Sequence, residues 1–210
     1  MIKFEVKLYS LKSQCWKKIE DQWPKKEWLI CSDSASSNGA LHWLVAKEGW
    51  RPENILAFDL ATEKFRVFTM PPQAPKNCMT NLVKLKGQLC FIMNIVMYND
   101  VKELYHDVWL MKEYGEGSSW TQIYKIEQCA VAWSFKYWTP LMLSKNGKKI
   151  LMEECHTDRT YLIWYDIENK IRERVKIQKL PKSFQTTICI GSLLLLDGDN
   201  VIDPTQNNNR

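Results

Sequence analysis

Short apolar and polar stretches alternate along the chain, and their spacing predicts antiparallel β-hairpins. Residues 55–60 and 65–68 are two apolar stretches separated by the polar segment 61–64. Each stretch has the length of a strand, and a short polar segment between them is typical of a hairpin turn. Pro71 and Pro72 end the second strand, because a proline has no amide hydrogen to donate to a strand ladder.

This hairpin pattern recurs. Residues 6–19, 107–126 and 161–177 each contain an aromatic-rich strand, a polar turn and a strand that opens with Trp or Ile. A second kind of hairpin turns on Asn38-Gly39, Lys86-Gly87 and Asn146-Gly147, with a weaker instance at Ile190-Gly191. Asn-Gly favours such turns because both of its residues adopt positive φ at little cost.

The glycines of these turns lie 48, 60 and 44 residues apart along the sequence. Units of four strands that recur every 40 to 50 residues or so are typical of β-propeller blades. The sequence therefore predicts an all-β fold, an incomplete kelch-like β-propeller of about three to four four-stranded blades built from antiparallel hairpins. Because the first hairpin has no partner before it, we expect residues 1–199 to form the C-terminal part of a larger propeller domain. We expect a disordered polar tail at 200–210.

The strand order also predicts a binding face. In a four-stranded blade the short turns emerge at one end, whereas the link to the next blade and the central connection emerge at the other. Counting strands in this way places all the long segments at the second of these ends. They are 20–27, 46–54, 71–81, 94–106, 127–139, 155–160 and 178–186. Binding residues concentrate on loops held by a rigid scaffold, and aromatic and arginine side chains dominate interface energies. The candidate protein-binding residues are Trp50, Arg51, Tyr98, Tyr105, Trp133, Tyr137, Trp138 and Arg159. The alternative for each aromatic residue is that it fills a groove between blades.

The composition of the chain limits the classes of partner that we expect it to bind. The net charge of +5 comes from 29 basic and 24 acidic residues, which we interpret as scattered, so no nucleic-acid partner is predicted. No apolar run is long enough to span a bilayer, so no membrane association is predicted. The seven cysteines include no Cys-x-x-Cys pair, which indicates reduced thiols and a cytoplasmic or nuclear protein. The ten tryptophans favour strands.

The pattern indicates no catalytic residue, metal site or cofactor. The three histidines, His42, His106 and His156, are too scattered for most metal or triad arrangements. Asp59 and Asp166 occupy equivalent positions beside hairpin turns, where a carboxylate usually accepts backbone hydrogen bonds. We therefore expect a binding protein and not an enzyme.

Several segments of the sequence are distinctive when taken together. The most specific is Asn-Gly-Ala-Leu-His-Trp-Leu at 38–44, followed by Ala-Phe-Asp-Leu at 57–60. The others are 6–19, 55–65, 85–89, 107–115 and 119–121. These segments resemble the F-box-associated region of plant F-box proteins, including the S-locus F-box and F-box/kelch-repeat proteins, and their order agrees through about residue 196. Nothing before Ile2 resembles the F-box itself.

This resemblance implies a propeller module that captures the target protein of an SCF-type (cullin-RING) ubiquitin ligase. The ligase adaptor and the cullin would be partners only where the full protein carries an F-box. Two alternatives stay open. One is a propeller-type glycan or small-molecule binding protein or hydrolase, which needs carboxylates or histidines converging on a central channel. The other is a truncated, non-functional fragment.

Overall fold

The computed structural model describes residues 5–20, 23–47, 51–71, 78–98, 102–128 and 135–188. These residues form strands joined by turns, with one short 3-10 helix, η1 (Gly117–Ser119). The strands are β1 (Lys7–Ser10), β2 (Cys15–Lys18), β3 (Leu29–Ile30), β4 (Ala35–Ser37), β5 (Ala40–Ala46), β6 (Asn54–Asp59), β7 (Lys64–Phe68), β8 (Cys78–Leu85), β9 (Gln88–Tyr98), β10 (Lys102–Met111), β11 (Trp120–Gln128), β12 (Phe135–Leu143), β13 (Lys149–His156), β14 (Thr160–Asp166) and β15 (Arg172–Arg174).

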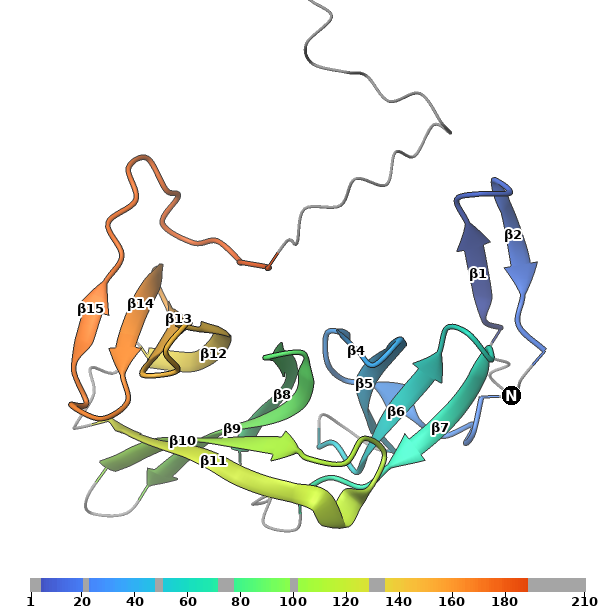
Figure 1. Cartoon of the computed structure of the whole chain (residues 1–210), viewed down its shortest axis with the longest axis horizontal. Coiled ribbons are helices and arrows are strands. Elements are labelled where there is room, and N and C mark those ends of the chain that lie inside the picture. The colour runs from blue at the N-terminus through green and yellow to red at the C-terminus, as the bar shows by residue number, and fades with distance from the viewer. Residues whose placement is uncertain are drawn as a thin grey trace, which may run out of the picture.

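The strands form successive antiparallel sheets arranged as an arc, with β8 and β12 towards its centre and β7, β11 and β15 on its outer side (Figure 1). Two sheets have the order β8-β9-β10-β11 and β12-β13-β14-β15. A third has β5, β6 and β7, and its inner strand is broken into β3 and β4, which both pair with β5. The hairpin β1–β2 forms a two-stranded sheet at one end of the arc. This arrangement is a partial β-propeller, which confirms the predicted fold class.

The core lies between the blades. Leu44, Ile55 and Phe68 of the first complete blade pack with Phe91 and Trp109 of the second. Strand β6 is therefore buried along almost its whole length, which explains why its sequence is a continuous apolar run and not an alternation. A second cluster, between the second and third blades, contains Ile126, Trp138, Ile150, Met152, Ile163 and Tyr165.

The glycine turns lie close together in space. Asn38 and Gly39 have φ values of 53° and 72°, as a hairpin turn of this type requires. The hydroxyl of Ser37 donates to the carbonyl of Gly87 at 3.1 Å, which joins the turns of two neighbouring blades. A Cβ built on Gly147 would lie 3.3 Å from Lys86 Nζ, so the turn of the third blade is adjacent as well. The prediction that these turns share one end of the blades is confirmed.

Two of the predicted long loops are largely strand, and these predictions were wrong. Strand β9 continues to Tyr98 and β10 begins at Lys102, so the segment 94–106 contains only a short connection. Asn94 and His106 explain this result: they face each other across β9 and β10, and His106 Nδ1 lies 2.6 Å from Asn94 Oδ1. In the segment 127–139 the described residues are likewise strand, at the end of β11 and the start of β12, and residues 129–134 lie outside the described residues. The weaker hairpin predicted to turn on Ile190-Gly191 lies outside the described residues, which end at residue 188.

Candidate protein-binding surface

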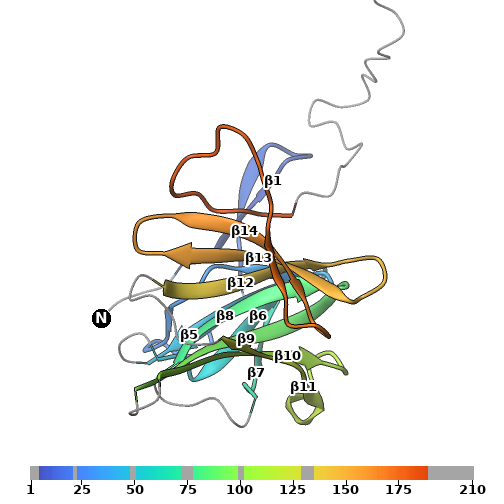
Figure 2. The same cartoon turned by 90° about the vertical axis from the view of Figure 1, so that its left-hand side faces the viewer.

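One end of the blades carries the connections opposite the glycine turns, and we call it the connector face. Figure 2 shows it at the left, where β13 passes into β14, while the β12–β13 turn and the β10–β11 loop lie at the right. Because strands alternate in direction, the ends of β5 and β9 and the starts of β6 and β10 belong to the connector face. Arg51 precedes β6 and is exposed, and Arg159 is exposed in the connection between β13 and β14.

Three of the candidate residues fall outside what the structure describes in full. Trp50 and Trp133 lie outside the described residues, and the side chain of Tyr98, the last residue of β9, does as well. Their roles stay predictions.

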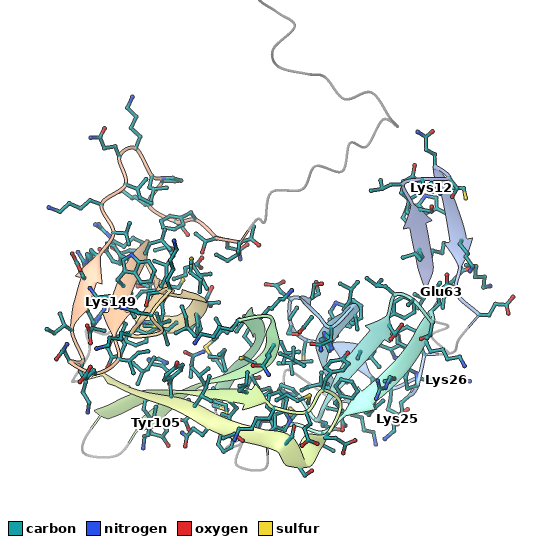
Figure 3. All side chains as sticks on the ribbon, viewed as in Figure 1. Lys12, Lys25, Lys26, Glu63, Tyr105 and Lys149 are labelled. Carbon is teal, nitrogen blue, oxygen red and sulfur yellow. The ribbon has the colours of Figure 1, made fainter. Side chains whose placement is uncertain are left out.

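Tyr105 lies near the start of β10 and is partly buried against the first core cluster. The ammonium group of Lys125 lies 4.4 Å from the centre of its ring, within the range of a cation–π contact. Figure 3 shows Tyr105 on the β10–β11 blade, near the bottom of the view. Tyr105 is therefore a half-buried aromatic residue with an adjacent cation, and its exposed part is open to a partner.

Tyr137 and Trp138 lie in strand β12 and not in a loop, so the predicted location of both was wrong. Trp138 is only 1% exposed, its ring stacks on His106 with centroids 4.3 Å apart, and its amide donates to Asn94 Oδ1 at 3.1 Å. These contacts join the second blade to the third, so this ring is part of the core and is not offered to a partner. Tyr137 is partly buried, and burial, followed by a hydrogen bond with Cys155, raises its pKa to about 12.

Arg159 belongs to a group that the sequence reasoning missed. The ring of Tyr161 lies within cation–π range of two guanidinium groups, with Arg174 at 3.9 Å and Arg159 at 6.0 Å from its centroid. His156 packs edge-on against the same ring, with centroids 5.5 Å apart. The three side chains therefore gather around one aromatic ring. The alternation of basic residues after 170 was the signal that could have found Arg174.

Behind this group lies a nearly buried carboxylate. The side chain of Glu154 is 3% exposed, and its two oxygens bind His156 Nε2 at 2.6 Å and the guanidinium group of Arg172. The guanidinium of Arg172 also lies 5.3 Å from the centre of the Trp138 ring. These interactions fix the third blade from its inner strand to its outer strand, so they serve structure.

A cavity of about 1340 Å³ lies between the inner strands, lined by β8, β12, residues 30–36 and the segment 185–188. Its carboxylates are Asp33 and Glu153, and Glu153 accepts hydrogen bonds from the amide (2.7 Å) and the hydroxyl of Thr186. Within the described residues, no three His, Cys, Asp or Glu side chains are grouped as a metal site. The cavity thus has one carboxylate already bound and does not present a reactive pair.

Within the described residues the cysteines are Cys15, Cys31, Cys78, Cys90 and Cys155, and none of them forms a disulfide. Burial raises the pKa of the Cys90 thiol to about 12, so this side chain acts as a small apolar residue. In the part of the chain with described coordinates, no helix has both the length and the apolar character needed to cross a membrane.

Successive four-stranded antiparallel sheets arranged as an arc define a partial β-propeller domain. The sequence matches the F-box associated beta propeller domain over residues 1–194, and the chain belongs to this family. It is 30% identical to the F-box protein CPR1 of Arabidopsis thaliana over 206 residues, covering 91% of this chain and 48% of the relative. It is 28% identical to the F-box/kelch-repeat protein At3g23880 of the same plant over 131 residues, covering 60% of this chain and 33% of the relative.

The chain therefore spans about half the length of CPR1, at 48%. Among solved structures, TolB from Acinetobacter baumannii superimposes with a TM-score of 0.42 and 17% identity, covering 84% of this chain and 38% of that chain.

Proposed function

We propose that this chain is the target-recognition module of an F-box subunit of an SCF-type ubiquitin ligase, and that it acts by binding and not by catalysis. The observation that supports the proposal most is the connector face: it presents exposed arginines and a half-buried tyrosine on a scaffold whose opposite end carries the glycine turns. Family membership supplies the context, since the relatives are named as F-box proteins. The proposed location is the cytoplasm or the nucleus, where such ligases work.

The mechanism is capture of a folded partner. Arg51 and Arg159 would form charge-assisted hydrogen bonds with the target, because a guanidinium group binds a carboxylate with two parallel N–H···O contacts. Tyr105, and Trp50 and Trp133 as predictions, would supply aromatic contact area at the same face. The ligase adaptor and the cullin would join only where the full-length protein carries an F-box, and the propeller itself would then contribute target choice.

Exchange of the two exposed arginines tests this role. The variant Arg51→Glu/Arg159→Glu reverses charge at the connector face, and Lys86→Glu/Lys145→Glu makes the same charge change at the turn end. Tagged proteins would be compared by affinity capture from plant extract with quantitative mass spectrometry. We expect the arginine variant to lose a defined set of proteins that the wild type and the lysine variant both retain. Equal capture by all of them, or equal loss in both variants, would contradict the proposal.

A further inference from the structure

Basic residues concentrate in one segment, 170–182, which we call the basic strap. It contains six basic residues, Lys170, Arg172, Arg174, Lys176, Lys179 and Lys182, and one acidic residue, Glu173. Its net charge of +5 equals that of the whole chain, which leaves 23 basic and 23 acidic residues elsewhere (29 less 6 and 24 less 1). The rest of the molecule is electrically balanced, so its long-range positive potential originates from the strap.

The strap is held in place by its backbone. The amide of Val175 donates to the carbonyl of Leu162 at 2.9 Å, and the carbonyl of Lys182 accepts from the amide of Thr160 at 2.8 Å. Both bonds anchor the strap to β14, and Figure 3 shows side chains projecting from it into solvent. The strap therefore presents its charges from a defined path on the third blade.

Four cations of the strap, Arg174, Lys176, Lys179 and Lys182, are available for a ligand. The acidic residues beside it already have basic partners: Glu154 binds Arg172, Glu173 lies 3.7 Å from Lys149, and Asp158 lies 3.1 Å from Arg159. Within the described residues, Arg174 and the three strap lysines after it form no ion pair with a carboxylate. The planar guanidinium group of Arg174 is oriented by the ring of Tyr161, which suits it to a carboxylate.

Apolar side chains alternate with these cations and are unusually exposed. Ile171, Ile177 and Leu180 are 62%, 48% and 42% exposed. Because consecutive residues of a strand point to opposite faces, Ile171 and Val175 lie on one face of β15 and its flanks, and Arg172 and Arg174 on the other. A flat bilayer needs both kinds of side chain in one plane, and single-stranded nucleic acid needs exposed rings for stacking. An extended peptide with the complementary alternation meets both faces at once.

The backbone of β15 supports the same partner. Strand β15 is the outer strand of its sheet and pairs only with β14 in the described part of the chain. Such an edge has amide and carbonyl groups able to pair with another strand. We propose that the basic strap binds an extended, acidic segment of a partner protein in which Asp or Glu alternates with aliphatic residues. This inference rests on the proposed function, in that it takes the ligand to be a protein.

The test uses the purified chain and a fluorescein-labelled peptide of Asp-Leu-Glu-Ile repeats, about 12 residues long so that it extends beyond the short strand β15 on both sides. Binding would be followed by fluorescence anisotropy. We expect Lys176→Glu/Lys179→Glu/Lys182→Glu to weaken binding by about tenfold or more, since three surface ion pairs at up to about 1 kcal/mol each are reversed. The matched control, Lys12→Glu/Lys26→Glu/Lys145→Glu, makes the same charge change elsewhere and is expected to bind as the wild type does. Lys12 and Lys26 lie at the opposite end of the arc (Figure 3).

Further ligands and a second variant separate this proposal from its rivals. Ile177→Ser keeps every charge and is expected to weaken the Asp-Leu-Glu-Ile peptide but not an Asp-Ser-Glu-Ser peptide. Equal loss in the control triple variant would overturn the proposal, and so would no binding by the wild type. Tighter strap-dependent binding of a single-stranded oligonucleotide, or of phosphatidylserine vesicles, would assign the strap to that ligand instead. If the peptide does not bind while the capture experiment gives the expected result, only the inference about the strap is wrong. If the peptide binds as expected while the capture experiment contradicts the proposed function, the strap is still a peptide-binding site.

Discussion

At the scale of single residues, His42 is a histidine used for structure. Its side chain is fully buried, its Nδ1–H donates to the carbonyl of Ala35 at 3.0 Å, and Nε2 accepts from the hydroxyl of Tyr114 at 2.9 Å. The bond to Ala35 needs a proton on Nδ1, because a carbonyl can only accept, and burial favours the neutral ring, in which Nε2 is the acceptor. Burial lowers the pKa of His42 below its ordinary value of 6.5, so the folded protein resists its protonation.

This lowered pKa predicts a pH dependence of stability. Below about pH 6.5 the unfolded chain protonates this histidine more readily than the folded chain does, so the free energy of unfolding falls as the pH decreases and is fully retained above that value. We expect His42→Gln to flatten the slope of stability against pH between about 5 and 7, by at most about 1.4 kcal/mol per pH unit for one proton. Urea unfolding at several pH values measures both slopes. Burial raises the pKa of Tyr114, which stays neutral throughout. Parallel slopes for wild type and variant would show that His42 is not the group involved.

Glu154 is a residue at which loss of the charge should lower the free energy of unfolding strongly. Its carboxylate is nearly buried and binds both His156 and Arg172. We expect Glu154→Gln to lower the free energy of unfolding by about 2 kcal/mol, less than for a fully buried pair because Arg172 is partly exposed. The matched control is Glu168→Gln, which removes an exposed pair with Lys148 and should change stability by less than about 0.5 kcal/mol. Urea midpoints at neutral pH compare them, and equal effects would mean that burial of the pair is unimportant.

At the scale of elements, the turns were predictable and several strand ends were not. Asn38-Gly39 and Lys86-Gly87 have positive φ at both residues, and a local rule suffices to find them. The continuation of β9 to Tyr98 was missed because Asn94 and the polar residues after it resemble a loop. Asn94 is buried by partners distant in sequence, His106 and the amide of Trp138, and no local pattern contains those contacts. The same limit placed Trp138 in a loop and left Arg174 unnoticed.

The loop between β10 and β11 docks on β7, and this contact can be tested. A Cβ added to Gly117 would overlap Thr69 Oγ1, and the indole N–H of Trp120 donates to the carbonyl of Thr69 at 2.9 Å. We expect Gly117→Ala to destabilise the protein by about 1–3 kcal/mol, the usual cost of overpacking. Thr69→Ala removes the clashing hydroxyl, so Gly117→Ala/Thr69→Ala should be more stable than Gly117→Ala alone. A double-mutant cycle from urea unfolding measures this coupling, and strictly additive effects would exclude the contact.

At the scale of the whole molecule, the residues proposed to bind partners and the residues that stabilise the fold lie in different places. The first and second core clusters lie between the blades and contain interactions that hold the arc together. The exposed arginines of the connector face and the exposed cations of the basic strap lie outside these clusters. Variants on these surfaces should therefore change binding with little effect on folding, which is the separation that the capture and peptide experiments need.

The arc should also be unequally stable along its length. Hairpin β1–β2 is a two-stranded sheet with Trp16 67% and Tyr9 42% exposed, and Lys17 joins it to the β6–β7 turn through Glu63 at 2.7 Å. A two-stranded hairpin is marginally stable in water, because it buries little apolar surface. Strand β9 pairs with a strand on both sides. Its Phe91 belongs to the first core cluster, and its Ile92 belongs to a further cluster on the other face of the sheet. Hydrogen exchange followed by mass spectrometry should show amides of β1 and β2 exchanging at least about a hundredfold faster than those of β9, because local opening of the hairpin costs little free energy. Equal protection of both regions would mean that another surface covers the hairpin in solution, and Trp16 would then be the residue at which to look for it.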